Sequence, residues 1–132
     1  MSFEATRALI AARLADNYVT YPIANENHEF TPPADGTPWV RLFIIEGDTD
    51  IAGLGGSTRL FRNTGIIMCQ IFIQEGKGTK DALDIADVLD TLWSGASFNG
   101  ITCRASSVTR VGTSDGWYQV NITTPYYWDN IK

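Results

Sequence analysis

The chain has 132 residues, of which 44% are apolar and 19% charged. A chain of this length forms one hydrophobic core, so we expect a single domain over residues 1–132 and exclude large two-domain enzymes. Ten Lys and Arg against fifteen Asp and Glu give a net charge of −5, which excludes proteins that bind nucleic acid by neutralising its phosphates.

The first half of the chain contains a predicted helix, a predicted strand and two irregular segments. Apolar residues at helical spacing predict a helix from Ser2, its expected N-cap, to about Asn17. Residues 18–38 contain four prolines, which excludes regular helix and predicts a long surface connection. Residues 39–46 alternate as a strand does, with two mostly apolar faces. Residues 48–57 are glycine-rich and without periodicity, which predicts a mobile loop.

The second half begins with a longer strand and a helix. The strand is predicted over residues 59–74, and Gly76-Lys77-Gly78 is the expected turn before a helix that is capped by Thr79 and ends near Gly95. The expected buried side of this helix comprises Ala82, Leu83, Ile85, Ala86, Val88, Leu89, Leu92 and Trp93. Its outer side is acidic and carries Asp81, Asp84, Asp87 and Asp90.

A hairpin is predicted at the end of the chain. Its strands cover residues 101–111 and 117–124, and Pro125 is expected to end the second strand because proline lacks the backbone donor. The elements then follow the order α-β-β-α-β-β. This order predicts an α+β fold with an antiparallel sheet of four or slightly more strands and two helices packed on one face.

Two glycine-containing motifs invite a catalytic or an anion-binding interpretation. Residues 112–116 match the G-x-S-x-G nucleophile motif around Ser114, but a strand follows where that motif requires a helix, so a hairpin turn is favoured. Residues 76–79 precede a helix, as phosphate-binding loops do, but lack the spacing of a P-loop, so a plain turn is favoured. The single histidine, His28, has no second histidine or cysteine cluster to work with and is expected to lie on the surface of the long connection or to pack within it.

The remaining polar and sulfur-containing residues also indicate no chemistry. Cys69 and Cys103 are too few for a disulfide scaffold and too widely spaced for zinc, which favours a reducing cytosol and no metal or cofactor. No stretch approaches the roughly 18 consecutive apolar residues of a transmembrane helix, so no membrane association is expected.

The sequence predicts more apolar sheet surface than two helices can cover, and more irregular segments than a single copy needs. The two central strands are apolar on both faces, whereas two helices cover only one face of such a sheet, so the other face needs a neighbour. The alternative is that residues 18–38 fold back over it. Segments that order only against a partner, together with the aromatic residues 126–128, favour self-assembly.

A set of short patterns is spread along almost the whole chain. In order they are Met1-Ser2-Phe3-Glu4, Asn27 with Phe30-Thr31-Pro32-Pro33, Gly36-Thr37-Pro38-Trp39-Val40-Arg41, Gly65 with Gln70-Ile71-Phe72-Ile73, Gly76 and Gly78 with Ala82, Ala86 and Leu89, and Trp117-Tyr118-Gln119-Val120-Asn121-Ile122 with Pro125-Tyr126. This ordered set resembles the tail-terminator, or tail-completion, proteins of long-tailed bacteriophages. The chain departs from the pattern at Gln74-Glu75, where a proline is expected.

The resemblance implies a structural virion protein without enzymatic activity. It would form a hexameric ring that caps the head-proximal end of the tail tube, stops tube polymerisation and joins the head, after assembly in the host cytoplasm. The implied partners are further copies of itself, the major tail tube protein and the head-completion (stopper) protein, and DNA would pass through without specific binding. The residues expected at a protomer or tube interface are Gly53, Leu54, Gly55, Gly56, Arg59 and Arg62, and those expected to face the channel are Asp81, Asp84 and Asp87.

Two alternatives remain open at this stage. A different neck component of similar build, such as a head-closure protein, would also be a small α+β assembly protein. A small hydrolase or ligand-binding domain would instead depend on residues such as Ser114 or His28.

Overall fold

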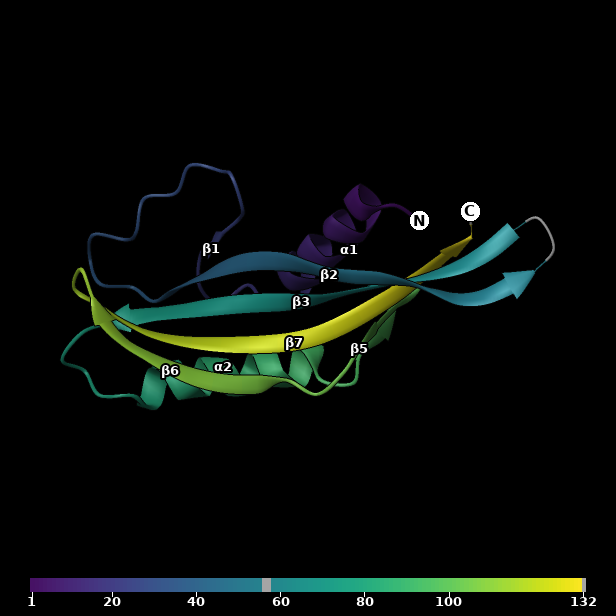
Figure 1. The fold of residues 1–132 in the computed structure, drawn as a ribbon. Helices are drawn as coiled ribbons and strands as arrows, with labels where there is room; N and C mark the ends of the chain where they lie inside the picture. Colours follow the sequence, from purple (N-terminus) through teal and green to yellow (C-terminus); the bar gives the residue numbers. More distant parts are fainter. Residues whose placement is uncertain (56–57, 132) are drawn as a thin grey trace.

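One mixed sheet and two helices make up the part of the chain that the structure, a computed structural model, describes, namely residues 1–55 and 58–131 (Figure 1). In chain order the elements are α1 (Phe3–Asn17), β1 (Ile23–Ala24), β2 (Trp39–Gly55), β3 (Thr58–Gln74), α2 (Lys80–Trp93), β4 (Ser97–Phe98), β5 (Ile101–Cys103), β6 (Ser107–Ser114) and β7 (Trp117–Ile131). The fold is therefore α+β, as the sequence predicts.

The sheet is larger than expected and is mixed. Its strand order is β1-β2-β3-β7-β5-β4, and β6 pairs with β7 beside this path. The pairing of β1 with β2 is parallel, and all other pairings are antiparallel. The expected four-stranded antiparallel sheet and the order α-β-β-α-β-β are thus wrong. The missed strands β1 and β4 are each two residues long, which is too short for an alternating pattern to be visible. The single strand predicted over residues 101–111 is instead two strands, β5 and β6, because residues 104–106 between them do not join the sheet.

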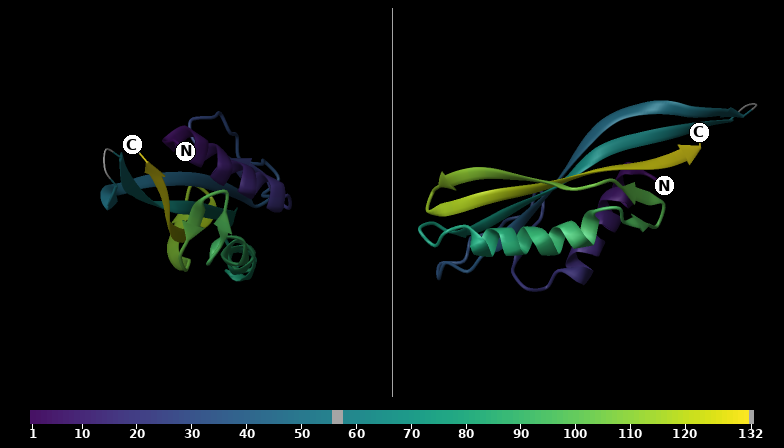
Figure 2. Two further views of the ribbon diagram at one scale, coloured as in Figure 1. Left: turned by 90° about the vertical axis from the view of Figure 1, so that its right-hand side faces the viewer. Right: turned by 90° about the horizontal axis from the view of Figure 1, so that it is seen from below.

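Both helices pack on the same face of the sheet, as expected, and enclose one core (Figure 2). Ser2 caps α1 through a 3.1 Å hydrogen bond from the Ala5 N–H to its Oγ, as predicted. Thr79 occupies the N-cap position of α2, but its side chain makes no capping hydrogen bond. Arg13 of α1 donates to the Leu92 carbonyl of α2 at 2.9 Å, which links the two helices. Of the residues expected on the buried side of α2, Val88 is wrong, since its side chain is 52% exposed.

The predicted ends of β2 and β7 are wrong, because both strands continue to pair with β3 beyond the predicted positions. Residues 48–55, expected in a loop, continue β2, and Gly56 and Ser57 lie outside the described residues. β7 runs through Pro125 to Ile131. Opposite Pro125 the neighbouring strand is interrupted between Cys103 and Ser107, so the missing N–H of proline removes no bond of the ladder.

The central strands bend at a bulge and extend past the helices. Gly47 and Asp48 of β2 together face Thr64 of β3, and such an extra residue bends and twists the strand. Beyond this point lies the arm, which comprises residues 49–55 of β2, 58–63 of β3 and 128–131 of β7. The right panel of Figure 2 shows the arm projecting beyond both helices.

Candidate assembly surfaces

The arm carries the residues that the sequence analysis proposed for a protomer or tube interface. Gly53 and the backbones of Leu54 and Gly55 lie in β2, where they pair with the start of β3. Arg59 lies opposite Leu54 and is exposed. Gly56 lies outside the described residues. The structure thus places Gly53, Leu54, Gly55 and Arg59 on one strand pair, whereas the sequence predicts a loop over residues 48–57.

Arg62, the second predicted interface cation, is used inside the chain. Its Nε and Nη2 donate to the two carboxylate oxygens of Asp129, both at 2.9 Å, and its guanidinium lies 4.4 Å from the ring centre of Tyr127. The hydrogen bonds from Arg62 hold the pKa of Asp129 below its ordinary value of 3.8. Arg62 therefore joins β3 to β7 and fixes one face of the arm.

A buried asparagine joins the strands of the arm on its other face. Asn63 is 2% exposed, and its Oδ1 accepts a 2.8 Å hydrogen bond from the Thr49 hydroxyl. Its Nδ2 donates to Asn130 Oδ1 at 3.1 Å. One side chain thus bonds to β2 and β7 at once, and nothing in the sequence singles it out.

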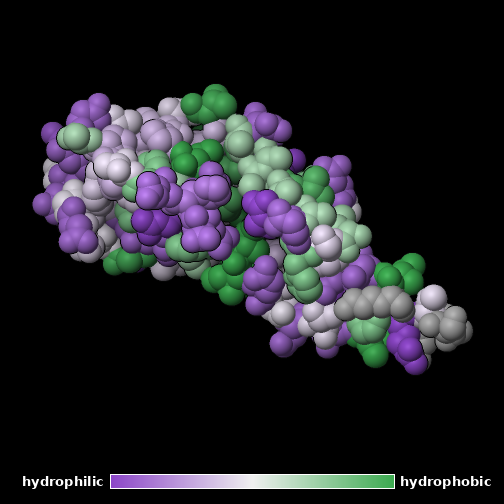
Figure 3. Space-filling model, turned by 90° about the horizontal axis from the view of Figure 1, so that it is seen from above, coloured by the Kyte–Doolittle hydropathy of each residue, from purple (hydrophilic) through white to green (hydrophobic). Residues whose placement is uncertain are grey.

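The arm exposes apolar side chains near its end. Ile51 is 56% exposed and Ile131 is 69% exposed, and both lie beyond the reach of the helices. Figure 3 shows hydrophobic side chains on the arm where it projects from the body. Exposed apolar groups on a projecting strand pair are typical of a protein interaction surface.

The face of the sheet opposite the helices is covered only in part. Phe30, from the long connection, stacks on Trp39 at 4.9 Å between ring centres, and Trp39 is 2% exposed. The alternative that residues 18–38 fold back over this face is therefore correct at the Trp39 end. Farther along the face, Ile45 is 49% exposed and Ile66 is 37% exposed. The rest of this face is open to a neighbour.

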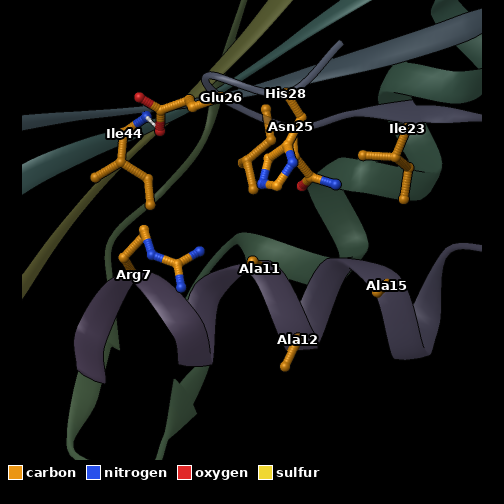
Figure 4. Close-up of a pocket in the computed structure, with 10 residues that line it drawn as sticks. Arg7, Ala11, Ala12, Ala15, Ile23, Asn25, Glu26, His28 and Ile44 are labelled. Atoms are coloured by element: carbon orange, nitrogen blue, oxygen red, sulfur yellow. Dashed lines mark hydrogen bonds between the residues drawn. The ribbon is translucent and has the colours of Figure 1, made fainter. Parts of the chain in front are cut away.

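A groove of about 390 Å³ runs between α1 and the long connection (Figure 4). Its apolar lining comes from Ala11, Ala15, Ile23 and Ile44, and Figure 4 shows Asn25 and His28 reaching from the connection toward α1. Glu26 accepts a 2.9 Å hydrogen bond from the Ile44 N–H through its Oε1. One oxygen of its carboxylate therefore bonds to a backbone N–H at the edge of β2.

The motif around Ser114 lies at the connection between β6 and β7. Asp115 and Gly116 both have positive φ, 53° and 84°, as a two-residue hairpin turn requires, which confirms the turn interpretation of residues 112–116. Ser114 lies at the end of β6 and lines a different pocket from His28. Cys69 and Cys103 are buried and free, and burial raises their pKa values to about 12 and about 11.

The aspartates of α2 lie on its outer side, as predicted. Asp81, Asp84 and Asp87 are exposed, and Asp84 pairs with Lys80 at 2.6 Å. Within the described ranges, no cluster of three or more His, Cys, Asp or Glu residues could hold a metal ion. In the same ranges, none of the helices is long and apolar enough to cross a bilayer.

A comparison with known families bears on the remaining interpretations. The family model of the phage tail terminator protein matches residues 5–126, nearly the whole chain. The chain belongs to the phage tail terminator family. The match spans both helices and most of the sheet, so family membership applies to the fold as a whole. It gives the protein a structural role in the phage tail.

The fold also occurs among solved structures. Seventeen chains of solved structures are similar to this one. One of them is 28% identical in sequence with a TM-score of 0.70, and the match covers 97% of this chain and 96% of that chain. No curated protein matches the sequence.

Proposed function

We propose that this protein caps the head-proximal end of the phage tail tube as a ring, ends tube polymerisation and provides the joint to the head-completion proteins. The observation that carries the proposal is the terminator family match over residues 5–126. It leaves almost no part of the chain outside the family pattern, so the proposed role belongs to the whole domain.

The surfaces of the fold support an assembly role. A capping ring needs contacts between copies, with the major tail tube protein and with the head-completion protein. The arm with its exposed Ile51 and the open sheet face around Ile45 are ordered surfaces that the chain itself leaves uncovered. We infer six copies per ring, in keeping with the resemblance to tail terminators.

The acidic helix suits a channel through which DNA passes. Asp81, Asp84 and Asp87 would line this passage, and carboxylates offer no partners to DNA phosphates. A ring multiplies the net charge of −5 that each copy carries. DNA would therefore move through the ring without being held.

We infer a structural rather than a catalytic role. A nucleophile requires a base within hydrogen-bonding reach, and Ser114 and His28 line separate pockets. Glu26, which lines the same groove as His28, uses one carboxylate oxygen to accept a hydrogen bond from the backbone of β2.

Tail length tests the proposal. When the gene is removed from the phage and assembly products are imaged by electron microscopy, we expect over-long tubes without heads, because tube growth has no stop. Expression of the protein in trans is the control and should restore the normal length. Tails of normal length in its absence would contradict the proposal.

A binding experiment separates a tail terminator from a head-closure protein. We expect the purified protein to co-sediment with isolated tail tubes of finished length and not with DNA-filled heads that lack tails. The reverse preference would assign the protein to the head side of the joint.

A further inference from the structure

Two long strands, β2 and β6, lie at open edges of the sheet, on opposite sides of the molecule. Among the strands of residues 1–55 and 58–131, β6 pairs with β7 alone, and β2 pairs on its outer side only with β1, at Val40 and Arg41. Farther along β2, the Glu26 carboxylate accepts a hydrogen bond from the Ile44 N–H. No described strand pairs with the outer side of residues 45–55 of β2. Figure 1 shows β2 and β6 along opposite edges of the sheet. Backbone donors and acceptors on an unpaired edge are a template for another strand.

Both edges also expose apolar side chains. On β6, Val108 is 48% exposed and Val111 is 53% exposed. On β2, Ile45 and Ile51 are 49% and 56% exposed. Pairing of two such edges would satisfy the backbone groups and cover these side chains together.

The two edges carry opposite charge. Residues 45–55 of β2 include Glu46, Asp48 and Asp50 and no Lys or Arg. β6 includes Arg110 and no Asp or Glu. Like charges on facing strands repel and unlike charges attract. Contact between two β2 edges or two β6 edges is therefore disfavoured, and contact between a β2 edge and a β6 edge is favoured.

We propose that the β2 edge of one copy pairs with the β6 edge of the next, so that the sheet continues from copy to copy. The occupant of each edge is a second copy of this chain. Such a contact uses different surfaces on the two partners, and repeated head-to-tail contacts form a ring when the rotation between copies closes. This inference rests on the proposed ring function and names the surfaces that build the ring.

Cysteine crosslinking tests which edges meet. Ile51→Cys places a thiol on the β2 edge, and Val108→Cys places one on the β6 edge. The native Cys69 and Cys103 are buried, and burial raises their pKa values, so the introduced thiols react first. The two variants are mixed in equal amounts and oxidised mildly, and the disulfide dimers are identified by non-reducing mass spectrometry. We expect the mixed Ile51→Cys/Val108→Cys dimer to exceed either homodimer by about tenfold.

A charge exchange shows whether the attraction is electrostatic. Adding Arg110→Glu to the β6 variant should lower the yield of mixed dimer about tenfold, and adding Asp50→Lys to the β2 variant should then restore it. Lys77→Glu makes the same change of charge at an exposed turn that belongs to neither edge strand and should leave the yield unchanged. Statistical proportions of the three dimers, an excess of homodimers, or an equal effect of Lys77→Glu would overturn the edge pairing.

The two proposals fail in different ways. Over-long tails in the absence of the protein, together with statistical crosslinking, would overturn the edge pairing and leave the capping function in place. Tails of normal length in its absence, together with a large excess of mixed dimer, would overturn the capping function and retain the edge pairing.

Discussion

At the scale of single residues, the arm depends on side chains that bond within the chain. Arg62 looks like a surface cation in the sequence, yet it forms a two-point ion pair with Asp129, 67 residues away. Asn63 is an ordinary polar residue in the sequence, yet it is buried and bonds to two other strands. Such pairs depend on strand register, which links residues far apart in the chain.

Replacing Asp129 with Asn should lower the free energy of unfolding by about 0.5–1 kcal/mol near neutral pH, since the pair is partly exposed. The pKa of Asp129 is lowered in the folded protein, so its contribution is present above its ordinary pKa of 3.8 and is lost as pH falls through the folded value. The difference between wild type and variant in urea unfolding should therefore shrink below about pH 3.8.

The exposed Lys80–Asp84 pair is the control for this measurement. Lys80→Ala removes a one-point contact between side chains that are 85% and 57% exposed, so we expect a smaller change than for Asp129→Asn. Equal effects of the two substitutions would show that the Arg62–Asp129 pair does not fix the arm.

Gly65 should tolerate no side chain. A Cβ at this position would lie 2.6 Å from the Tyr126 ring, which is 3% exposed and enclosed by the core. We expect Gly65→Ala to lower the free energy of unfolding by about 1–3 kcal/mol through overpacking. At Gly53 a Cβ would lie 3.7 Å from Leu60 Cβ, which is an ordinary contact. Gly53→Ala should therefore change the free energy of unfolding by less than about 0.5 kcal/mol. Similar values for the two variants in thermal or urea unfolding would contradict this.

At the scale of elements, the strands extend further than local sequence indicates. Gly53 and Gly55 lower strand propensity, and Pro125 removes a donor, but both segments pair with β3 along their length. The backbone bonds to a long central strand outweigh these local preferences. β3 is the strand whose limits are best predicted, because its apolar alternation is continuous.

The arm should be dispensable for folding and needed for association. We expect replacement of residues 52–60 by an Asn-Gly turn between Ile51 and Phe61 to leave the melting temperature nearly unchanged, because both helices and the core lie outside the arm. Association, measured by analytical ultracentrifugation and by binding to isolated tail tubes, should weaken. The full-length Gly53→Ala variant is the control, since it keeps the arm. Undiminished association of the shortened variant would rule out the interface role of the arm.

At the scale of the whole molecule, the two faces of the sheet are covered to different extents. Both helices enclose one face in a single core. The other face is covered by Phe30 near Trp39 and is open farther along, where Ile45 and Ile66 are exposed. Excess apolar sheet surface is visible in the sequence, but the extent of its cover depends on where the proline-containing connection runs.

The sequence alone determined the two helices, the central strands, the α+β class and the family, because these rest on local periodicity and on residue patterns along the chain. Only the tertiary structure decided the mixed sheet, the arm and the partners of Arg62 and Asn63. Pairing between distant strands extended β2 and β7, recruited the short strands β1, β4 and β5, and brought Asp129 to Arg62. These features arise from contacts across the sheet, and local propensity carries no information about which distant strand lies alongside.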